Sequence, residues 1–353
     1  MRIVVAMSGG VDSSVAAALL AEAGHEVLGL SMQLYDQQEG QAAWGSCCTL
    51  DDLHDARRVA AAVGFPHYIV NFERQFDEQV VSNFVREYLA GRTPLPCARC
   101  NSELKFATLL DRARALDAEV VATGHYARLD RDEAGRLVLK RGVDPRKDQS
   151  YFLFSLTQAQ LARAMFPVGS MTKAEVRAQA RRLGLPVAEK HESQEICFVP
   201  DGDYAAFIDR RAPAADRGGP IVDADGRLLG RHDGIHHFTV GQRKRLGVAR
   251  GVPLYVLELR PESRAVVVGP RDALDRTRLT ASDVNWIAGE PPSVTLRVQA
   301  QIRYRHPARP ASLRALDAGR AEAEFEEAQP AITPGQAVVF YDGETVVGGG
   351  WIE

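Results

Sequence analysis

A glycine-rich loop near the start of the chain constrains the fold more than any other feature. The run SGGVDSS, residues 8–14, follows the apolar stretch Ile3–Met7 and overlaps the start of a helical pattern over Asp12–Ala23. Two glycines allow a sharp turn that brings backbone N–H groups up to a phosphate, and the serine hydroxyls and the helix N-terminus add to the attraction. The loop lacks both the lysine of a Walker A loop and the GxGxxG spacing. The sequence therefore predicts a phosphate-binding strand–loop–helix unit of another kind.

Up to about residue 130 the chain keeps the rhythm of a parallel α/β fold. Short apolar runs alternate with helical patterns, and glycines repeatedly stand just past the helix ends. The expected strands are Ile3–Met7, Glu26–Met32, 66–72 and 119–126, and the expected helices are Asp12–Ala23, Asp51–Val63, one that ends at Gly91, and Glu103–Leu116. Further on, Thr172 and Glu175 form a capping-box pattern before a helix that Gly184 closes.

The composition changes near residue 211, where Ala, Pro, Asp and Gly dominate and helical patterns nearly vanish. Beyond it we expect strands at short spacing, typical of a small antiparallel barrel. The predicted domains are residues 1–210, an α/β domain with a parallel sheet; residues 211–277, a small β-rich domain; and residues 278–353, an antiparallel β-barrel.

Composition favours a globular protein of two or three domains. The 353 residues are 45% hydrophobic and 25% charged. The apolar run at the N-terminus is too short for a signal-peptide core, and no run approaches the roughly 18 apolar residues of a membrane span. We therefore expect a cytoplasmic protein without a membrane partner. Its five cysteines favour thiols, metal ligands or redox chemistry over a disulfide framework.

The positive charges are gathered in three places although the net charge is only −3. Arg and Lys outnumber acidic residues between 136 and 182, and no acidic residue interrupts Arg243–Arg250 or Val294–Arg309. These three islands could form a discontinuous surface for an anionic polymer such as a nucleic acid. They could equally be solvated faces.

Two cysteines lie close together in the run GRTPLPCARCN. Cys97 and Cys100 are placed by the prolines in a loop just before the helix expected from Glu103, and Cys197 follows much later in the run SQEICFVP. Taken alone, the CxxC spacing suits zinc or thioredoxin-like chemistry, and Cys197 suits a buried core position. Cys47 and Cys48 are adjacent, which rarely suits one tetrahedral metal, so we expect them to be structural. His54, His67, His191, His236 and His237 show no ligand spacing.

Several motifs together make the chain resemble the PP-loop ATP pyrophosphatases and, more narrowly, the tRNA-specific 2-thiouridylases. They span residues 6 to 341 in this order: AMSGGVDSS, GRTP-P--CN, ATGHYAR, KDQSYFL, ICF, TVGQRKRLG, RYRHP and TPGQAVVFY. The resemblance implies an N-terminal domain like the adenine nucleotide alpha hydrolases. It also implies a reaction that adenylates the C2 oxygen of a wobble uridine and replaces it with sulfur.

The resemblance also implies roles for individual residues. The ATP contacts would be Ala6, Met7, Ser8, Gly9, Gly10, Val11, Asp12, Ser13, Met32 and Gly124, with Mg²⁺ accompanying the nucleotide. The contacts with tRNA or with its target base would be Leu95, Pro96, Cys97, His125, Lys147, Asp148, Gln149, Tyr304, Arg305 and Gln336. The catalytic residues would be Cys100 and Cys197. We expect KDQS to lie within the basic stretch and RYRHP to lie on a strand of the C-terminal sheet. The cationic and aromatic side chains in both runs are of the type that holds phosphates and an unstacked base.

The expected chemistry needs activation, because the C2 oxygen is a poor leaving group until AMP is attached to it. A persulfide on Cys197 could then deliver sulfur, and Cys100 could attack it and leave a Cys100–Cys197 disulfide. The expected partners are a tRNA with a wobble uridine and a sulfur donor, which would be a cysteine desulfurase, a sulfur-relay protein or free sulfide.

The sequence departs from the family pattern at two positions. Many relatives have Asn where this chain has Leu95 and Asp where it has Cys97, and a thiol is a weaker acid than a carboxyl group by roughly four to five pKa units. With Cys97 present, Cys97, Cys100 and Cys197 could instead hold an iron–sulfur cluster that binds a sulfide at an open iron. Persulfide, cluster and a bystander Cys97 remain open, and a catalytic zinc is less suited to sulfur delivery.

Two other kinds of protein share part of the pattern. A small-molecule PP-loop synthetase would adenylate and then aminate its substrate, and it would not need KDQS or RYRHP. An RNA-binding protein could use ATP only as a conformational ligand, in which case the cysteines would be dispensable.

Overall fold

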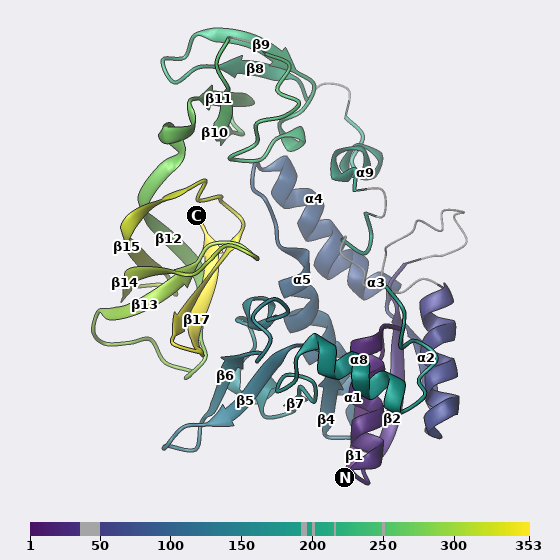
Figure 1. The fold of residues 1–353 in the computed structure, drawn as a ribbon. Coiled ribbons are helices and arrows are strands. Elements are labelled where there is room, and N and C mark those ends of the chain that lie inside the picture. Colours follow the sequence, from purple (N-terminus) through teal and green to yellow (C-terminus); the bar gives the residue numbers. More distant parts are fainter. Residues whose placement is uncertain (36–49, 192–195, 200–201, 215–216, 249–250) are drawn as a thin grey trace.

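Three sheets organise the chain in the computed structural model, which describes residues 1–353 except 36–49, 192–195, 200–201, 215–216 and 249–250 (Figure 1). A five-stranded parallel sheet lies in the N-terminal part, a four-stranded sheet in the middle, and an eight-stranded sheet contains the C-terminal barrel. The architecture expected from the sequence is confirmed. Cys47, Cys48 and Arg250 lie outside the described residues.

The parallel sheet has the strand order β3-β2-β1-β4-β7. Its strands are β1 (Arg2–Ala6), β2 (Glu26–Gln33), β3 (His67–Asn71), β4 (Val120–Thr123) and β7 (Ala164–Met165). Alternate residues of β1 point to opposite faces: Val4 belongs to one apolar cluster, and Ile3 and Val5 belong to another. Because both faces are covered, the strands read as continuous apolar runs rather than as alternating ones.

One face of the sheet carries three helices, and the other carries a long interrupted helical layer (Figure 1). The first set is α1 (Val11–Glu22), α2 (Leu50–Val63) and α8 (Lys173–Arg182). The predicted capping box at the start of α8 is confirmed, since Thr172 and Glu175 each bond the other's backbone N–H. The second layer is α3 (Glu73–Phe76), η1 (Asp77–Val81), α4 (Ser82–Leu89), α5 (Pro96–Arg99), η2 (Cys100–Thr108) and α6 (Leu109–Arg114).

The placement of Cys97 and Cys100 corrects the sequence-based expectation. They do not lie in a loop, because the helix begins at Pro96, seven positions before the expected start at Glu103. Proline suits the first turn of a helix, where its missing N–H has no partner to lose. From Cys100 the helix continues as a π-helix, η2, a wider winding that often occurs at functional sites.

The middle of the chain forms the small four-stranded sheet, with the order β10-β11-β8-β9. Its strands are β8 (Gly219–Val222), β9 (Leu228–His232), β10 (Tyr255–Arg260) and β11 (Ala265–Gly269), and the short helices beside it are α9 (Tyr204–Arg211) and η4 (Ile235–His237). Helix α9 packs against α4 through aromatic side chains: the rings of Tyr204 and Tyr88 stack at 4.6 Å. These contacts join the middle of the chain to the N-terminal helices.

Six antiparallel strands close into the C-terminal barrel, because β12 pairs with both β15 and β17. The strands are β12 (Asp275–Trp286), β13 (Leu296–Gln301), β14 (Arg309–Ala315), β15 (Ala321–Pro330), β16 (Ala337–Asp342) and β17 (Thr345–Ile352). The expectation that RYRHP belongs to a strand is wrong: residues 303–307 follow β13 as a turn, and Arg305 has a φ of +65°. A turn exposes side chains that a closed sheet would direct inward or outward in alternation.

A hairpin from the N-terminal part extends the barrel sheet. Strands β5 (Ala127–Arg131) and β6 (Leu137–Arg141) pair with each other, and β6 joins β17 through Thr345 and Lys140. The remaining short helices are η3 (Ser150–Phe152), α7 (Gln158–Leu161) and η5 (Arg271–Leu274). Within the described part of the chain, no helix is both long and apolar enough to cross a membrane.

Candidate active site

A pocket of about 430 Å³ opens at the carboxyl ends of the parallel strands. Ala6 ends β1, Thr123 ends β4 and Met32 lies near the end of β2, and all three residues line it. Strand β1 lies between β2 and β4, and the chain continues from β1 to one side of the sheet and from β4 to the other. The loops that follow β1 and β4 therefore diverge at this point. Such a switch point is where open α/β sheets bind ligands.

The glycine-rich loop is held by close backbone contacts. Gly9 has a φ of +71°, and a side chain there would meet the backbone oxygen of Asp52 at 2.2 Å. A side chain on Gly124 would meet the backbone nitrogen of Ser13 at 2.5 Å. Inside the loop, Ser8 N–H donates to Ser13 Oγ at 3.2 Å, and Gly10 provides no side-chain cap for α1. The N-terminal N–H groups of α1 are thus presented to the pocket without a capping side chain.

Asp12 lies in the first turn of α1 and is bound by two side chains from elsewhere in the chain. Lys173 Nζ donates to its two carboxylate oxygens at 2.7 and 2.9 Å, and Tyr126 Oη donates to Oδ1 at 2.7 Å. Lys173 is the first residue of α8, and Tyr126 follows β4. The contact joins α1, α8 and the β4 loop at one carboxylate.

A second lysine binds the other side of the loop. Lys190 Nζ donates to Gly9 O at 3.1 Å, to Asp52 Oδ1 at 2.6 Å and to Asp55 Oδ2 at 2.5 Å. Burial lowers the pKa of Lys190, but hydrogen bonds to the two carboxylates more than offset this, so its pKa lies above the ordinary value. Lys190 therefore stays charged at neutral pH and bridges the glycine-rich loop to α2.

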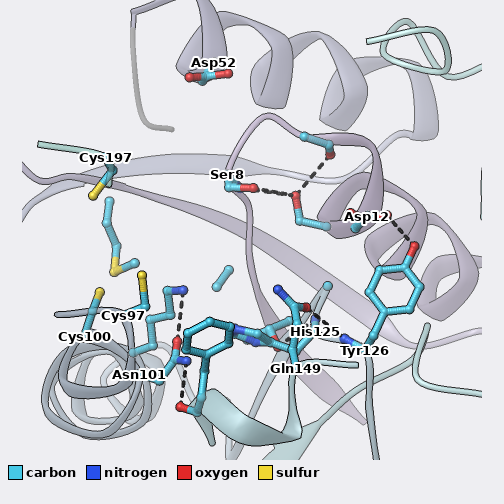
Figure 2. A pocket seen from close by; sticks show the side chains of 18 of the residues that line it. Ser8, Asp12, Asp52, Cys97, Cys100, Asn101, His125, Tyr126, Gln149 and Cys197 are labelled. Carbon is cyan, nitrogen blue, oxygen red and sulfur yellow. Dashed lines mark hydrogen bonds between the residues drawn. The ribbon is translucent and has the colours of Figure 1, made fainter. Parts of the chain in front are cut away.

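The three described cysteines face the same pocket from the side opposite the glycine-rich loop (Figure 2). Cys97 is exposed, Cys100 is buried, and Cys197 is intermediate; no disulfide joins these three. Cys97 and Cys100 lie in the first turns of a helix, where the helix dipole favours a thiolate. Cys197 comes from the chain after Ile196, and its neighbour Phe198 packs edge-on against Phe84 at 5.0 Å. The structure thus brings together cysteines that are about a hundred residues apart.

Lys105 and His125 also line the pocket. Lys105 Nζ donates to Asn101 Oδ1 at 3.1 Å, and Asn101 Nδ2 donates to the backbone oxygen of Phe152 at 3.1 Å (Figure 2). His125 Nδ1 lies 2.6 Å from Thr123 Oγ1. Burial, and then the nearby charge of Lys105, hold the pKa of His125 well below its ordinary value. A neutral imidazole and a cation that lies near enough to influence it therefore both line the pocket.

The structure brings most of the expected site residues to this pocket. The residues that line it are Ala6, Met7, Ser8, Gly10, Val11, Asp12, Ser13, Met32, Pro96, Cys97, Cys100, Gly124, His125, Lys147, Gln149, Cys197, Tyr304 and Arg305. At its mouth, the ring of Tyr304 lies 4.5 Å from that of Phe152, and the Arg305 guanidinium lies 5.7 Å from the Tyr304 ring. A base could stack against such a surface.

Four expected residues are not among those that line it, and each has another place. Gly9 contacts α2, as described above. Asp148 is almost buried and accepts hydrogen bonds from Arg141, Gly142 and Ser150. Gln336 donates to the backbone oxygens of Thr93 and Pro94 at 3.0 and 3.4 Å. Leu95 lines a second cavity between α4, α5 and the barrel.

Sequence reasoning missed several residues that the structure places at the pocket, against Asp12 or beside the middle sheet. Lys105, Lys173 and Lys190 were not singled out, although the first lies one turn beyond Cys100 and the third precedes Cys197 by seven positions. His236 and His237, for which no ligand spacing was found, each place Nε2 against Asp209, at 2.8 and 3.2 Å. Their possible metal ligand atoms lie within 4.8 Å of one another, but Arg217 approaches the same carboxylate at 3.8 Å and disfavours a cation there.

Comparison with known families and proteins agrees with this geometry. The family model described as the tRNA methyl transferase HUP domain matches residues 1–201. Models described as the tRNA methyl transferase PRC-barrel domain and the aminomethyltransferase beta-barrel domain match residues 205–270 and 276–352. The solved NMN synthetase from Francisella tularensis covers 53% of this chain and 64% of its own at 18% identity, with a TM-score of 0.33 that adds nothing further.

Curated relatives match over nearly their whole length. The tRNA-specific 2-thiouridylase MnmA of Geotalea uraniireducens is 56% identical, covering 100% of this chain and 95% of its own. The protein of the same name from Solibacter usitatus is 56% identical, with 99% of each chain covered. That of Halothermothrix orenii is 46% identical, with 100% and 99% covered. On the evidence of the fold, the pocket and these matches, the chain belongs to the family of tRNA-specific 2-thiouridylases.

Proposed function

We propose that this chain is an ATP-dependent sulfurtransferase that converts the wobble uridine of tRNA into 2-thiouridine, with AMP and pyrophosphate as the other products. The observation that supports it most is that one pocket is lined by the glycine-rich loop on one side and by three thiols on the other. An adenylating enzyme that transfers sulfur needs both a phosphate site and a sulfur nucleophile within reach of one base. The proposed domain limits remain near residues 210 and 277.

The nucleotide would bind across the loop at residues 8–13, with Met32 and Gly124 beside it. Its α-phosphorus would be attacked by the C2 oxygen of the base, and pyrophosphate would leave. Mg²⁺ prefers one or two carboxylates together with phosphate oxygens. Asp12 and Asp52 both line the pocket and suit it by type, although each is bonded to a lysine in this structure.

The target base would be drawn out of its stack, because the C2 atom is not accessible within stacked RNA. Lys147, Gln149, Tyr304 and Arg305 stand at the pocket and could hold the phosphates and the base. Asp148 and Gln336 would support the site without contacting the RNA, because hydrogen bonds to other groups of the protein occupy both side chains.

For sulfur delivery, a Cys197 persulfide would attack the C2 atom with its outer sulfur, and AMP would leave with the C2 oxygen. The Cys100 thiolate would then attack Cys197 Sγ and form a Cys100–Cys197 disulfide. The electron pair of the broken S–S bond stays on the sulfur of the base, which becomes 2-thiouridine. An external dithiol reductant would return both cysteines to thiols.

The exposed Cys97 gives a rival form of this last step. Cys97, Cys100 and Cys197 suit an iron–sulfur cluster by donor type, since three thiols face one pocket and such clusters are held by thiolates. A bound cluster would supply an iron that carries the incoming sulfide. Under this form the chain's own residues would still bind the nucleotide and orient the base, and no cysteine disulfide would form.

One experiment tests the proposal. Protein purified without oxygen is mixed with unmodified tRNA, ATP and a sulfur source, and 2-thiouridine is measured by mass spectrometry of the digested nucleosides. The source is sulfide in one arm, for the cluster form, and a cysteine desulfurase with L-cysteine in the other, because only persulfide sulfur can charge a reduced Cys197 without an oxidant. We expect ATP-dependent sulfur incorporation that a tRNA with a wobble cytidine does not support. Absence of incorporation by the wild type with both sulfur sources would contradict the function itself. Full activity of Cys97→Asp in iron-free protein would contradict the cluster, while the Cys100→Ser variant should be inactive in either case.

A further inference from the structure

Cys97 and Cys100 are neighbours within one helical turn. The backbone N–H of Cys100 donates to the backbone oxygens of Cys97 and Pro96. The bond to Cys97 is that of a 3₁₀-type turn, in which side chains three positions apart lie nearly in line. Alpha carbons three positions apart in a helix are separated by about 5 Å, and disulfides join alpha carbons that are roughly 4.4 to 6.8 Å apart. The two residues therefore have the backbone spacing of a disulfide.

The turn that carries Cys97 can also adjust to form such a bond. Leu95 precedes the helix and gives it no side-chain cap, and α5 has four residues before the winding changes at Cys100. An uncapped helix end opens at a low cost in free energy. Movement of this one turn can therefore close the remaining distance between the two sulfur atoms.

The three described thiols of the pocket differ in exposure. Cys100 is buried in the apolar core, Cys197 is intermediate, and Cys97 is exposed. The sulfur atoms of Cys97 and Cys100 point toward the part of the pocket where Cys197 lies (Figure 2). Thiol–disulfide exchange needs access of a thiolate to one sulfur of the disulfide. An external reductant therefore reaches Cys97 more readily than it reaches the other two.

We propose that Cys97 is a resolving cysteine, which takes over the disulfide from Cys197 after sulfur transfer. This rests on the proposed function in its persulfide form, which leaves a Cys100–Cys197 disulfide. The Cys97 thiolate attacks Cys100 Sγ, so that the Cys97–Cys100 bond forms and the Cys100–Cys197 bond breaks. The electron pair of the broken bond leaves on Cys197 Sγ, which takes up a proton, while the proton of Cys97 passes to water. The exchange involves no net oxidation or reduction of the protein.

The exchange changes what each cysteine can do next. Cys197 is again a thiol and can accept another sulfur, and the disulfide now includes the exposed sulfur of Cys97. One thiolate of a dithiol protein attacks that sulfur, and its second thiol then attacks the mixed disulfide. The partner leaves with the disulfide, and Cys97 and Cys100 are returned to thiols. The reductant partner of this step is thus a protein with a reactive pair of thiols.

The test is a single turnover without reductant. Protein loaded with persulfide by a cysteine desulfurase and L-cysteine is separated from both, mixed with unmodified tRNA and ATP, and quenched with acid and N-ethylmaleimide. Disulfides are assigned by mass spectrometry of tryptic peptides, because cleavage after Arg99 separates Cys97 from Cys100. We expect a Cys97–Cys100 bond in the wild type and a Cys100–Cys197 bond in Cys97→Ser, with equal amounts of 2-thiouridine. A sample without ATP gives the background of disulfides.

Repeated turnover gives a second measurement. With a limiting amount of a dithiol protein as reductant, Cys97→Ser should thiolate tRNA about tenfold more slowly than the wild type, because its disulfide is less accessible. With dithiothreitol, a small reductant, the two rates should be similar. Ser102→Ala is the matched control, since Ser102 lies on the same run of helix, bonds to the backbone oxygens of Ala98 and Arg99, and does not line the pocket. It should behave as the wild type with both reductants.

Thiolation and disulfide mapping together separate this inference from the proposed function. If the wild type forms no 2-thiouridine with either persulfide or sulfide, both fail. Thiolation with sulfide alone, or without any cysteine disulfide, leaves the function intact and overturns the inference together with the persulfide form. A Cys100–Cys197 bond in the wild type, or an equal loss of rate with both reductants, overturns the inference alone. Oxidised glutathione should also form the Cys97–Cys100 bond in Cys197→Ser, and its failure to do so would overturn the inference without any turnover.

Discussion

The nucleotide side of the pocket is built from neighbours in the sequence and in the sheet, whereas the sulfur side is collected from distant segments. Ser8, Asp12 and Gly124 follow directly on two hydrogen-bonded parallel strands. Cys100 belongs to a π-helix, and Cys197 follows it by almost a hundred residues. The nucleotide side can be recognised from a short motif, because its geometry depends on few contacts between neighbouring residues. The sulfur side depends on the whole fold, so substitutions far away in the sequence can change its properties.

The largest effect is expected on the sulfur side of the pocket. Cys100→Ser should lower the rate of tRNA thiolation at least about a thousandfold, because a hydroxyl does not replace a thiolate as a nucleophile or as a cluster ligand. Binding of ATP should be unchanged, since Cys100 lies across the pocket from the loop. Thiolation is measured on purified tRNA and ATP binding by calorimetry. A parallel loss of ATP affinity would show that the two sides are not separable.

The next largest effect is expected on the nucleotide side of the pocket. Gly124→Ala places a methyl group 2.5 Å from the backbone nitrogen of Ser13, so either the β4 loop or α1 must move. We expect a loss of about 1 to 3 kcal/mol in stability and a clear loss of ATP affinity. Gly135→Ala is the control for ATP affinity, because Gly135 has open space around it and lies between β5 and β6, so the backbone strain that its own positive φ adds stays away from the pocket. Equal ATP affinity in both variants would contradict the close contact.

A pH effect is expected at His125, which lies between the two sides. The folded protein keeps it neutral because its pKa is held well below the ordinary value by burial and by Lys105. The unfolded chain takes up a proton as the pH falls through about 6.5, so the unfolded state binds more protons and stability falls with falling pH.

One such group contributes at most about 1.4 kcal/mol per pH unit. Denaturant unfolding of the wild type and His125→Asn at pH 7.5 and 5.5 measures the difference. The variant should lose less stability on acidification. Burial also lowers the pKa values of four other histidines, His67, His232, His236 and His306. Both the wild type and the variant should therefore lose some stability on acidification through these four. Identical pH dependence of the two would contradict a neutral, buried His125.

The smallest effect concerns the contact between the barrel and the cysteine helix. Gln336→Ala removes the bonds to Thr93 and Pro94 just before α5, and we expect stability to fall by about 1 kcal/mol with a modest loss of turnover. Gln329→Ala, which removes a partly buried hydrogen bond to the backbone oxygen of Glu327 within the barrel, serves as the control for stability alone. Weaker tRNA binding at unchanged stability would instead support a direct RNA contact by Gln336.

The sequence allowed the fold class, the loop at residues 8–13 and most of the pocket to be predicted, because these follow from local periodicity and from motifs. It did not reveal that Cys97 and Cys100 lie within a helix, since proline reads as a loop residue unless its place at a helix start is known. Nor did it reveal the β5–β6 hairpin, whose partner β17 lies some two hundred residues away. Lys105, Lys173 and Lys190 were missed for the same reason, because a lysine becomes a site residue only through its partners in space.

The shared sheet of β6 and β17 also determines how the molecule can bend. Since the hairpin of the N-terminal part continues the barrel's hydrogen bonding, these two parts cannot separate without breaking a sheet. Among the described residues, no strand of the middle sheet pairs with these two parts, and α9, η4 and η5 make the connection instead. Arg243, Lys244 and Arg245 are exposed in the loop between η4 and β10. If the protein adapts to RNA of different shapes, we therefore expect the middle sheet to move as a unit. The N-terminal part and the barrel should keep their relative positions, and the pocket should keep its shape.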